Sequence, residues 1–141
     1  MSKKLVYLST EWKEEAEKRL KRELTSEKLK GLSSTVANIH LNCPDGKKRF
    51  IYSRYEKGEL VDFLVGEGDS IKAEFVISGE YDTYVGIFKE EISTRDAFSS
   101  GKIKFKGNMI KAIKLVPIAA KVNRILGSIT TKYGNSGEYG T

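Results

Sequence analysis

The stretch that decides the fold runs SGEYDTYVGIFKEEISTRDAFSSGKIKFKGNMIKAIKL, residues 78–115. Its apolar residues follow a helical spacing after residue 80, alternate over residues 102–106, and return to a helical spacing after residue 108. Residues that favour turns and helix ends stand at each joint. The stretch therefore predicts a helix, a short helix, a strand and a further helix, with the rest of the chain forming a sheet and an outer helix around them.

Local signals mark the ends of these predicted elements. Ser93 and Asp96 have the spacing of a capping box, which predicts the start of the short helix, and Gly101 is expected to end it. Asn108 can cap a helix that runs through Val116. The apolar face of that helix is predicted to consist of Met109, Ala112, Ile113 and Val116.

Pro117 is expected to interrupt this last helix. A proline inside a helix removes a hydrogen bond and clashes with the preceding turn. The residues that follow are again amphipathic, so a separate second segment is expected there.

Upstream of this stretch, the sequence predicts one helix and four strands. Residues 11–30 place an apolar residue at every fourth position among alternating acids and bases, which indicates an outer helix with a narrow buried stripe. Four later segments either alternate in polarity or are rich in residues that suit strands, and turn residues separate them. Because the connecting loops are short, an antiparallel meander is expected. The predicted strands are residues 36–43, 49–56, 60–65 and 71–78.

The length of 141 residues suits one domain with its own core. We expect a single domain over residues 1–133 and a flexible tail over the glycine-rich residues 134–141. The single cysteine excludes an internal disulfide framework. The sequence shows neither a secretory signal nor an apolar stretch of the ~20 residues that span a bilayer, so a cytoplasmic protein is expected.

The net charge of +6 leaves two interpretations open. A basic protein can simply be soluble, or it can have an anionic partner such as nucleic acid, a membrane surface or an acidic ligand. Basic residues occur without any acid between Gly101 and Tyr133, and apolar helical faces alternate with them. That composition is typical of a membrane-surface contact, although an ordinary solvated face has it too. The residues that could contact an anionic membrane are Lys102, Lys104, Lys106, Lys111, Lys114, Lys121 and Arg124.

Nucleic acid is not the expected partner. Phe98 and Phe105, the aromatic residues near this basic run, fall at core-facing positions, and no recognition motif is present.

Catalysis finds little support in the sequence. The single histidine and single cysteine, His40 and Cys43, have an odd spacing in a predicted strand and should face opposite sides, which argues against a nucleophilic pair. We expect a buried cysteine and a surface histidine. Two such residues are too few for a zinc site, and no phosphate-binding glycine loop or dinucleotide fingerprint occurs. The chain is therefore not expected to be an enzyme.

Three features resemble the sterol carrier protein type 2 family of lipid-binding domains. The first is a predicted strand that ends in Ser78 and runs into an aromatic-rich helix. The second is the run DAFSSGKIK, residues 96–104, and the third is the turn KGNM, residues 106–109, which leads into a helix. The resemblance covers the second half of the chain well, and the first half in the order of its elements.

The resemblance implies an α+β fold. In this fold a curved, mainly antiparallel five-stranded sheet carries helices over one face and encloses an apolar tunnel for lipid, and no cofactor is needed. From periodicity alone, the apolar residues of the second half could equally form a filled core. The resemblance implies that the tunnel and its mouth are lined by Tyr84, Phe88, Phe98, Ile103, Phe105, Met109, Ile113, Ile118, Val122, Ile125 and Leu126.

The resemblance also implies a function: non-catalytic binding of fatty acids, fatty acyl-CoA or sterol-like molecules, with transfer of these lipids between membranes. Two alternatives stay open. One is an accessory subunit that presents an apolar substrate to an enzyme, and the other is a basic nucleic-acid-binding protein.

Overall fold

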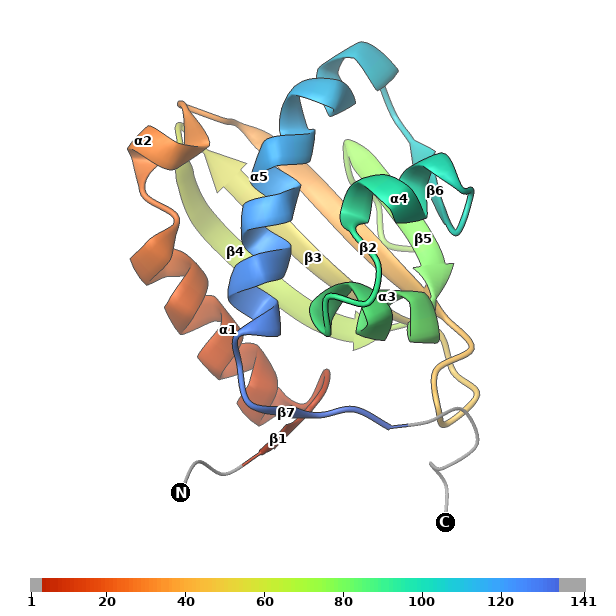
Figure 1. Cartoon of the computed structure of the whole chain (residues 1–141). Helices are drawn as coiled ribbons and strands as arrows, with labels where there is room; N and C mark the ends of the chain where they lie inside the picture. Colours follow the sequence, from red (N-terminus) through yellow and green to blue (C-terminus); the bar gives the residue numbers. More distant parts are fainter. Residues whose placement is uncertain (1–3, 135–141) are drawn as a thin grey trace.

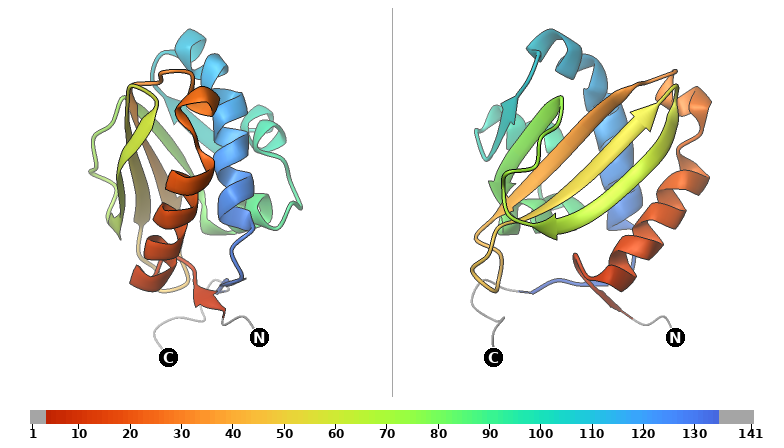
Figure 2. Two further views of the ribbon diagram at one scale, coloured as in Figure 1. Left: turned by 90° about the vertical axis from the view of Figure 1, so that its left-hand side faces the viewer. Right: turned by 180° about the vertical axis from the view of Figure 1, so that it is seen from behind.

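The computed structural model describes residues 4–134 and contains a five-stranded sheet with helices over one face (Figures 1 and 2). The strand order across the sheet is β4-β3-β2-β5-β6. This confirms the predicted α+β class and the five-stranded sheet. The expected tail lies outside the described residues except for Gly134. The strands are β2 (Ser34–Leu41), β3 (Arg49–Glu56), β4 (Glu59–Glu67), β5 (Phe75–Glu80) and β6 (Ile103–Lys106).

The connectivity of the sheet differs from a meander. Strands β2, β3 and β4 form consecutive antiparallel hairpins, but β5 pairs with β2 in parallel, and β6 then pairs antiparallel with β5. The prediction of a meander is therefore wrong for the fourth strand. The connection over residues 68–74 is irregular and long enough to carry the chain past β3 and β2 to the far side of β2. The alternation at residues 71–74 belongs to this connection and does not pair.

Within residues 4–134, the helices lie on one side of the sheet and leave its other face uncovered (Figure 2). Helices α1 and α5 pack against each other, and α5 also contacts α3 and α4. Short strands β1 and β7 pair in parallel near the two ends of the described chain. The helices are α1 (Thr10–Glu23), α2 (Ser26–Leu29), α3 (Tyr81–Phe88), α4 (Thr94–Ser99) and α5 (Met109–Gly127), and the short strands are β1 (Leu5–Val6) and β7 (Thr131–Lys132).

The buried stripe predicted for the outer helix is present on α1. Trp12, Ala16 and Leu20 are fully buried at every fourth position. The solvent side carries ion pairs between residues four apart, such as Lys13 with Glu17 at 2.9 Å. The helix ends earlier than predicted because Thr25 caps a separate short helix, α2, through its hydroxyl.

Pro117 does not break α5, which runs without interruption from Met109 to Gly127. The prediction of two segments is therefore wrong. Proline removes the hydrogen bond to the carbonyl of Ile113, but both residues are exposed, so water can reach that carbonyl. The predicted cap is confirmed, since the side chain of Asn108 accepts a hydrogen bond of 3.0 Å from the backbone N–H of Lys111.

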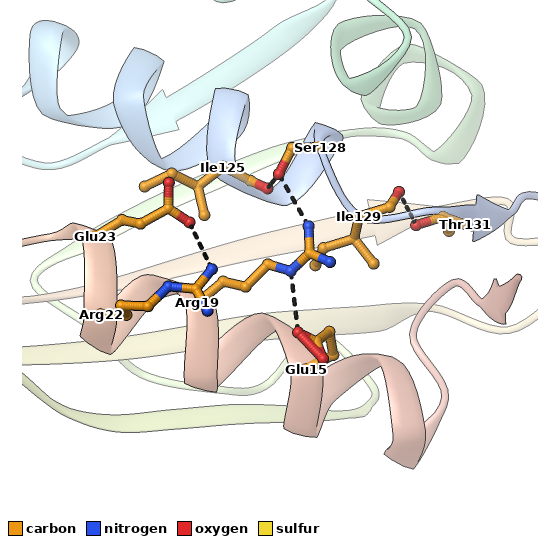
Figure 3. A network of polar contacts seen from close by, with 8 residues as sticks. All are labelled: Glu15, Arg19, Arg22, Glu23, Ile125, Ser128, Ile129 and Thr131. Carbon is orange, nitrogen blue, oxygen red and sulfur yellow. Dashed lines mark hydrogen bonds and ion pairs between the residues drawn. The ribbon is translucent and has the colours of Figure 1, made fainter. Parts of the chain in front are cut away.

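Two contacts hold the carboxyl-terminal end of α5. Arg19 of α1 donates to Glu15 at 3.0 Å and to the hydroxyl of Ser128 at 3.2 Å, which joins α1 to the end of α5 (Figure 3). On the other side, α5 approaches α3 so closely that a Cβ at Gly127 would lie 2.6 Å from the carbonyl oxygen of Phe88.

This close approach predicts an effect of replacing Gly127 by Ala. The new methyl group would meet backbone that cannot rotate away, so we expect a loss of about 1–3 kcal/mol in the free energy of unfolding, measured by urea denaturation. The matched control is Gly86→Ala in α3, where a Cβ would lie 3.4 Å from its nearest neighbour. Alanine favours a helix over glycine by up to about 1 kcal/mol, so this control should not lose stability. Equal stability of Gly127→Ala and wild type would contradict the close packing.

Candidate functional site

A pocket of about 540 Å³ lies between α5 and the segment that joins α3 to α4. Its apolar lining includes Phe88 and Ile92 on one side and Val116 and Ala120 on the other. Charged and polar groups, among them Arg95 and Arg124, complete it. The volume falls in the range of small-molecule sites, which is about 300–1,000 Å³.

The two walls of the pocket are fixed to each other at one end. Asn123 of α5 donates a hydrogen bond of 2.8 Å to the hydroxyl of Thr94 at the start of α4. Helix α4 is itself capped by Ser93, whose hydroxyl accepts from the backbone N–H of Asp96 at 3.0 Å, as the capping box predicted. The close approach of Gly127 to Phe88 holds the same end.

Toward the amino end of α5, the same helix face is exposed. Met109, Ile113, Val116 and Ala120 follow one another at helical spacing, and the last two line the pocket. Met109 is 49% exposed and Ile113 is 64% exposed, so this stripe is not part of the core. The apolar face predicted for this helix is thus largely open to solvent.

The sheet under this end of α5 is also incompletely covered. The strand register places Val36 of β2, Ile77 of β5 and Phe105 of β6 on the side of the helices. All three side chains are only half-buried. Phe98 of α4, itself exposed, stands over Phe105 with the two ring centres 6.3 Å apart. We call this floor, together with Phe98 and the stripe on α5, the apolar trough.

The predicted site residues fall into three groups. Tyr84, Phe88 and Leu126 are buried in the main core, with Ile118, Val122 and Ile125 packed against it, and Ile103 is buried in a second, smaller cluster. Phe98, Phe105, Met109 and Ile113 belong to the apolar trough. Phe88 is the member of the predicted set that lines the 540 Å³ pocket, and this pocket is open to solvent, not an enclosed tunnel.

Other residues that line the pocket were missed by the sequence analysis. Ala120 continues the stripe of Ile113 and Val116, but the expected break at Pro117 hid that continuity. Ile92 lies in the irregular segment between α3 and α4, where no periodicity marks it.

A salt bridge joins the amino-terminal half of α5 to the connection that leads into β5. The ammonium nitrogen of Lys111 lies 2.5 Å from one carboxylate oxygen of Glu74. The hydroxyl of Ser34, at the start of β2, donates a hydrogen bond to the other carboxylate oxygen. The hydrogen bond from Lys111 lowers the pKa of Glu74. Because the two charged side chains are both partly exposed, this salt bridge is a weak restraint.

His40 is fully buried, so the prediction of a surface histidine is wrong. Its ring stacks on Tyr84 of α3 with the ring centres 3.9 Å apart, and its Nε2 lies 2.7 Å from the hydroxyl of Tyr7. The polar side of β2 therefore faces the helices. Burial lowers the pKa of His40 to about 3, so the ring is neutral at pH 7 and can accept a hydrogen bond from the Tyr7 hydroxyl.

Cys43 is buried, as predicted. Its sulfur lies 3.6 Å from the backbone oxygen of His40, not from the imidazole ring. Burial and then the charge of Asp45 raise the pKa of the thiol to about 11, which suppresses the thiolate that a nucleophile needs.

Within residues 4–134, no group of three His, Cys, Asp or Glu side chains is placed to hold a metal ion. No helix in this part of the chain is long and apolar enough to cross a membrane.

A family model described as the SCP-2 sterol transfer family matches residues 14–120. Hydroxysteroid dehydrogenase-like protein 2 of Mus musculus is 32% identical over 106 residues, which cover 74% of this chain and 21% of the mouse protein. The protein of the same name from Xenopus tropicalis is 31% identical over 104 residues, covering 69% of this chain and 25% of that protein. This chain thus spans about a fifth to a quarter of the length of these relatives.

Solved structures share the fold. A crystal structure of sterol carrier protein 2 has a TM-score of 0.75 at 16% identity, covering 87% of this chain and 98% of that one. The solution structure of the sterol carrier protein domain 2 of Helicoverpa armigera has a TM-score of 0.58 at 20% identity, covering 86% of this chain and 91% of that one. With the sheet order, the helix layer and the family model in agreement over most of its length, the chain belongs to the SCP-2 sterol transfer family.

Proposed function

We propose that this protein binds a lipid with a long hydrocarbon portion in the apolar trough and does no covalent chemistry on it. The lipid would be a fatty acid, a fatty acyl-CoA or a sterol-like molecule, and the protein would carry it between membranes. The observation that carries this proposal is the exposed apolar stripe on α5, which runs from the amino end of the helix into a pocket of ligand size. Family membership supports it.

The energetics favour a hydrocarbon in this position. Apolar side chains exposed in a row are unfavourable in water, and a hydrocarbon lying between α5 and the sheet would cover both surfaces. Each buried methylene group contributes about 0.8 kcal/mol, so ten of them supply about 8 kcal/mol before the cost of immobilising the chain. The trough needs no specific polar contact to reach useful affinity.

We propose that α5 moves to admit the lipid. Its carboxyl-terminal half is held by the core and by Ser128, whereas its amino-terminal half rests on the salt bridge between Lys111 and Glu74. Pro117 lies between the two halves and lacks one backbone hydrogen bond, which makes it the natural place for bending. In the closed position Phe98, Phe105, Met109 and Ile113 would contact the lipid. Outward movement of the amino-terminal half would open a path to the more deeply packed Tyr84, Phe88, Ile103 and Ile118, while Val122, Ile125 and Leu126 stay with the packed half.

A second candidate function is an accessory domain that presents an apolar substrate to an enzyme. It is favoured by the match to about a fifth to a quarter of much longer proteins named hydroxysteroid dehydrogenase-like. Affinity capture from a native extract separates the two functions, since a stable enzyme partner is expected for the accessory domain alone.

The direct test of lipid binding combines two measurements on purified protein. Native mass spectrometry should detect a co-purified lipid of one-to-one stoichiometry, and a fluorescent fatty acid should bind and be displaced by unlabelled lipid. A protein that is free of ligand and does not bind the fluorescent fatty acid would contradict the proposal.

Replacing Ala120 by Trp should block the site, because Ala120 lines the pocket from α5. The indole would occupy the space of the hydrocarbon, and we expect at least a tenfold loss of affinity for the fluorescent fatty acid, which is about 1.4 kcal/mol. The control is Ile110→Trp, which adds an indole to the outward side of the same helix, where Ile110 is 76% exposed. Equal affinity of both variants would place the ligand elsewhere.

Replacing Glu74 by Gln should speed lipid exchange. The amide keeps the shape of the side chain and can still accept from Ser34, but it loses the charge that attracts Lys111. We expect a severalfold faster dissociation of the fluorescent fatty acid in stopped-flow experiments, with less than about 1 kcal/mol change in stability. Asp69→Asn is the control, because it removes an exposed salt bridge to Lys48 with the same change of charge.

The pH dependence gives a second readout of this salt bridge. The pKa of Glu74 is lowered in the folded protein, so the salt bridge is present above the ordinary value of 4.5 and is lost as the pH falls through the lowered pKa. Dissociation from wild type should therefore accelerate at acid pH, and dissociation from Glu74→Gln should not. A common pH profile would show that Glu74 does not restrain the helix.

A further inference from the structure

We propose that the amino-terminal tip of α5 docks onto an anionic lipid bilayer. This docking tip consists of the apolar side chains Met109, Ile110 and Ile113 with the basic side chains Lys106, Lys111 and Lys114. The inference builds on the proposed lipid binding, because it names the surface from which lipid would enter, but the experiments below test it independently.

The exposed position of Ile110 is the first observation. Ile110 is 76% exposed and lies about 100° around the helix from the stripe that faces the trough. A lipid in the trough could cover Met109 and Ile113 but not Ile110. Single exposed apolar residues are ordinary, but here three of them occupy two turns of one helix end. A bilayer would cover all three at once.

The charge around the tip is the second observation. Lys106, Lys111 and Lys114 are exposed, and no acidic residue occurs between Gly101 and Tyr133. Glu74 is the acid in contact with this group, through its salt bridge to Lys111. Basic side chains that surround exposed apolar ones fit the interface of an anionic bilayer, where ammonium groups meet lipid phosphates and apolar groups enter the acyl boundary.

Helix α1 offers a useful contrast. It is the most highly charged helix, but its apolar residues Trp12, Ala16 and Leu20 are fully buried. Its charges are paired along the helix, as in the salt bridges of Glu17 with Lys13 and Lys21. Helix α1 therefore has neither apolar side chains for the bilayer nor an excess of one charge, whereas the tip of α5 has both.

The position of the tip connects docking to lipid entry. The amino end of α5 projects past the sheet at the opposite end of the molecule from β1 and β7 (Figure 1). The exposed stripe of the trough begins at the same end, with Met109 and Ile113. Lipid phosphates that attract Lys111 would compete with Glu74 for it, so contact with the bilayer would also loosen the restraint on α5.

A vesicle-binding experiment tests the charge component. The full chain should co-sediment with vesicles of phosphatidylcholine mixed with phosphatidylglycerol, and not with phosphatidylcholine alone. The double variant Lys106→Ala with Lys114→Ala should bind the mixed vesicles more weakly, by about fivefold for each lysine removed. The matched control is Lys18→Ala with Lys28→Ala, two exposed lysines on α1 and α2 that lie outside the docking tip. This control has the same net charge as the variant that lacks Lys106 and Lys114, and it should bind the mixed vesicles like wild type.

A tryptophan reporter tests where the bilayer contacts the protein. The single native tryptophan, Trp12, is fully buried, so its emission should not respond to vesicles. Ile110→Trp should shift its emission to the blue with the mixed vesicles. Leu64→Trp, at an exposed position on the uncovered face of the sheet, should not shift.

Three outcomes would overturn the docking proposal. They are equal losses in the two double lysine variants, a blue shift at position 64 but not at position 110, and tight binding of duplex nucleic acid without binding to vesicles. Binding of the fluorescent fatty acid is measured on the same variants without vesicles. If that binding is intact while vesicle binding fails, the docking surface is wrong and the lipid site stands.

Discussion

The approach of Gly127 to the carbonyl of Phe88 is the contact on which the rest of the arrangement depends. With no side chain between them, α5 and α3 meet backbone to backbone, and this fixes where α5 crosses the sheet. From this point the helix has a packed carboxyl-terminal half, with Leu126 in the core and Ser128 bound to Arg19. Its amino-terminal half continues beyond the main core. The exposed stripe is the consequence of a long helix that is packed at one end.

The buried polar cluster around His40 supports the same end of the molecule from the inside. The ring of His40 accepts a hydrogen bond from the Tyr7 hydroxyl and stacks on Tyr84. The ring of Tyr7 also packs edge-to-face against Trp12, with the ring centres 4.8 Å apart. Strand β1, helix α1, the sheet and helix α3 are thus joined by neutral hydrogen bonds and aromatic contacts. A neutral histidine suits this role because a buried charge would need a partner. Packing and hydrogen bonding in this cluster therefore account for the buried His40 without a catalytic role.

The sequence predicted local structure better than it predicted which surfaces are covered. Ser93 and Asn108 identified helix starts correctly, because a cap depends on residues within one turn. Alternation in β2 separated His40 from Ile39, but it could not say which side the helices cover, so the histidine was assigned to the wrong side. The parallel pairing of β5 and the continuity of α5 through Pro117 depend on partners far away in the chain. For the trough, periodicity found Met109 and Ile113, but only packing shows that nothing in residues 4–134 covers them fully.

Pro117 has a consistent place in this arrangement. It lies at the boundary between the half of α5 that the core holds and the half that carries the exposed apolar residues. A missing hydrogen bond at this boundary costs little, because Ile113 is exposed to water, and it lowers the resistance of the helix to bending there. The packed half can therefore stay in place while the other half moves. The proposed lipid site needs such a separation, since movement of the whole helix would expose Leu126 and the core beneath it.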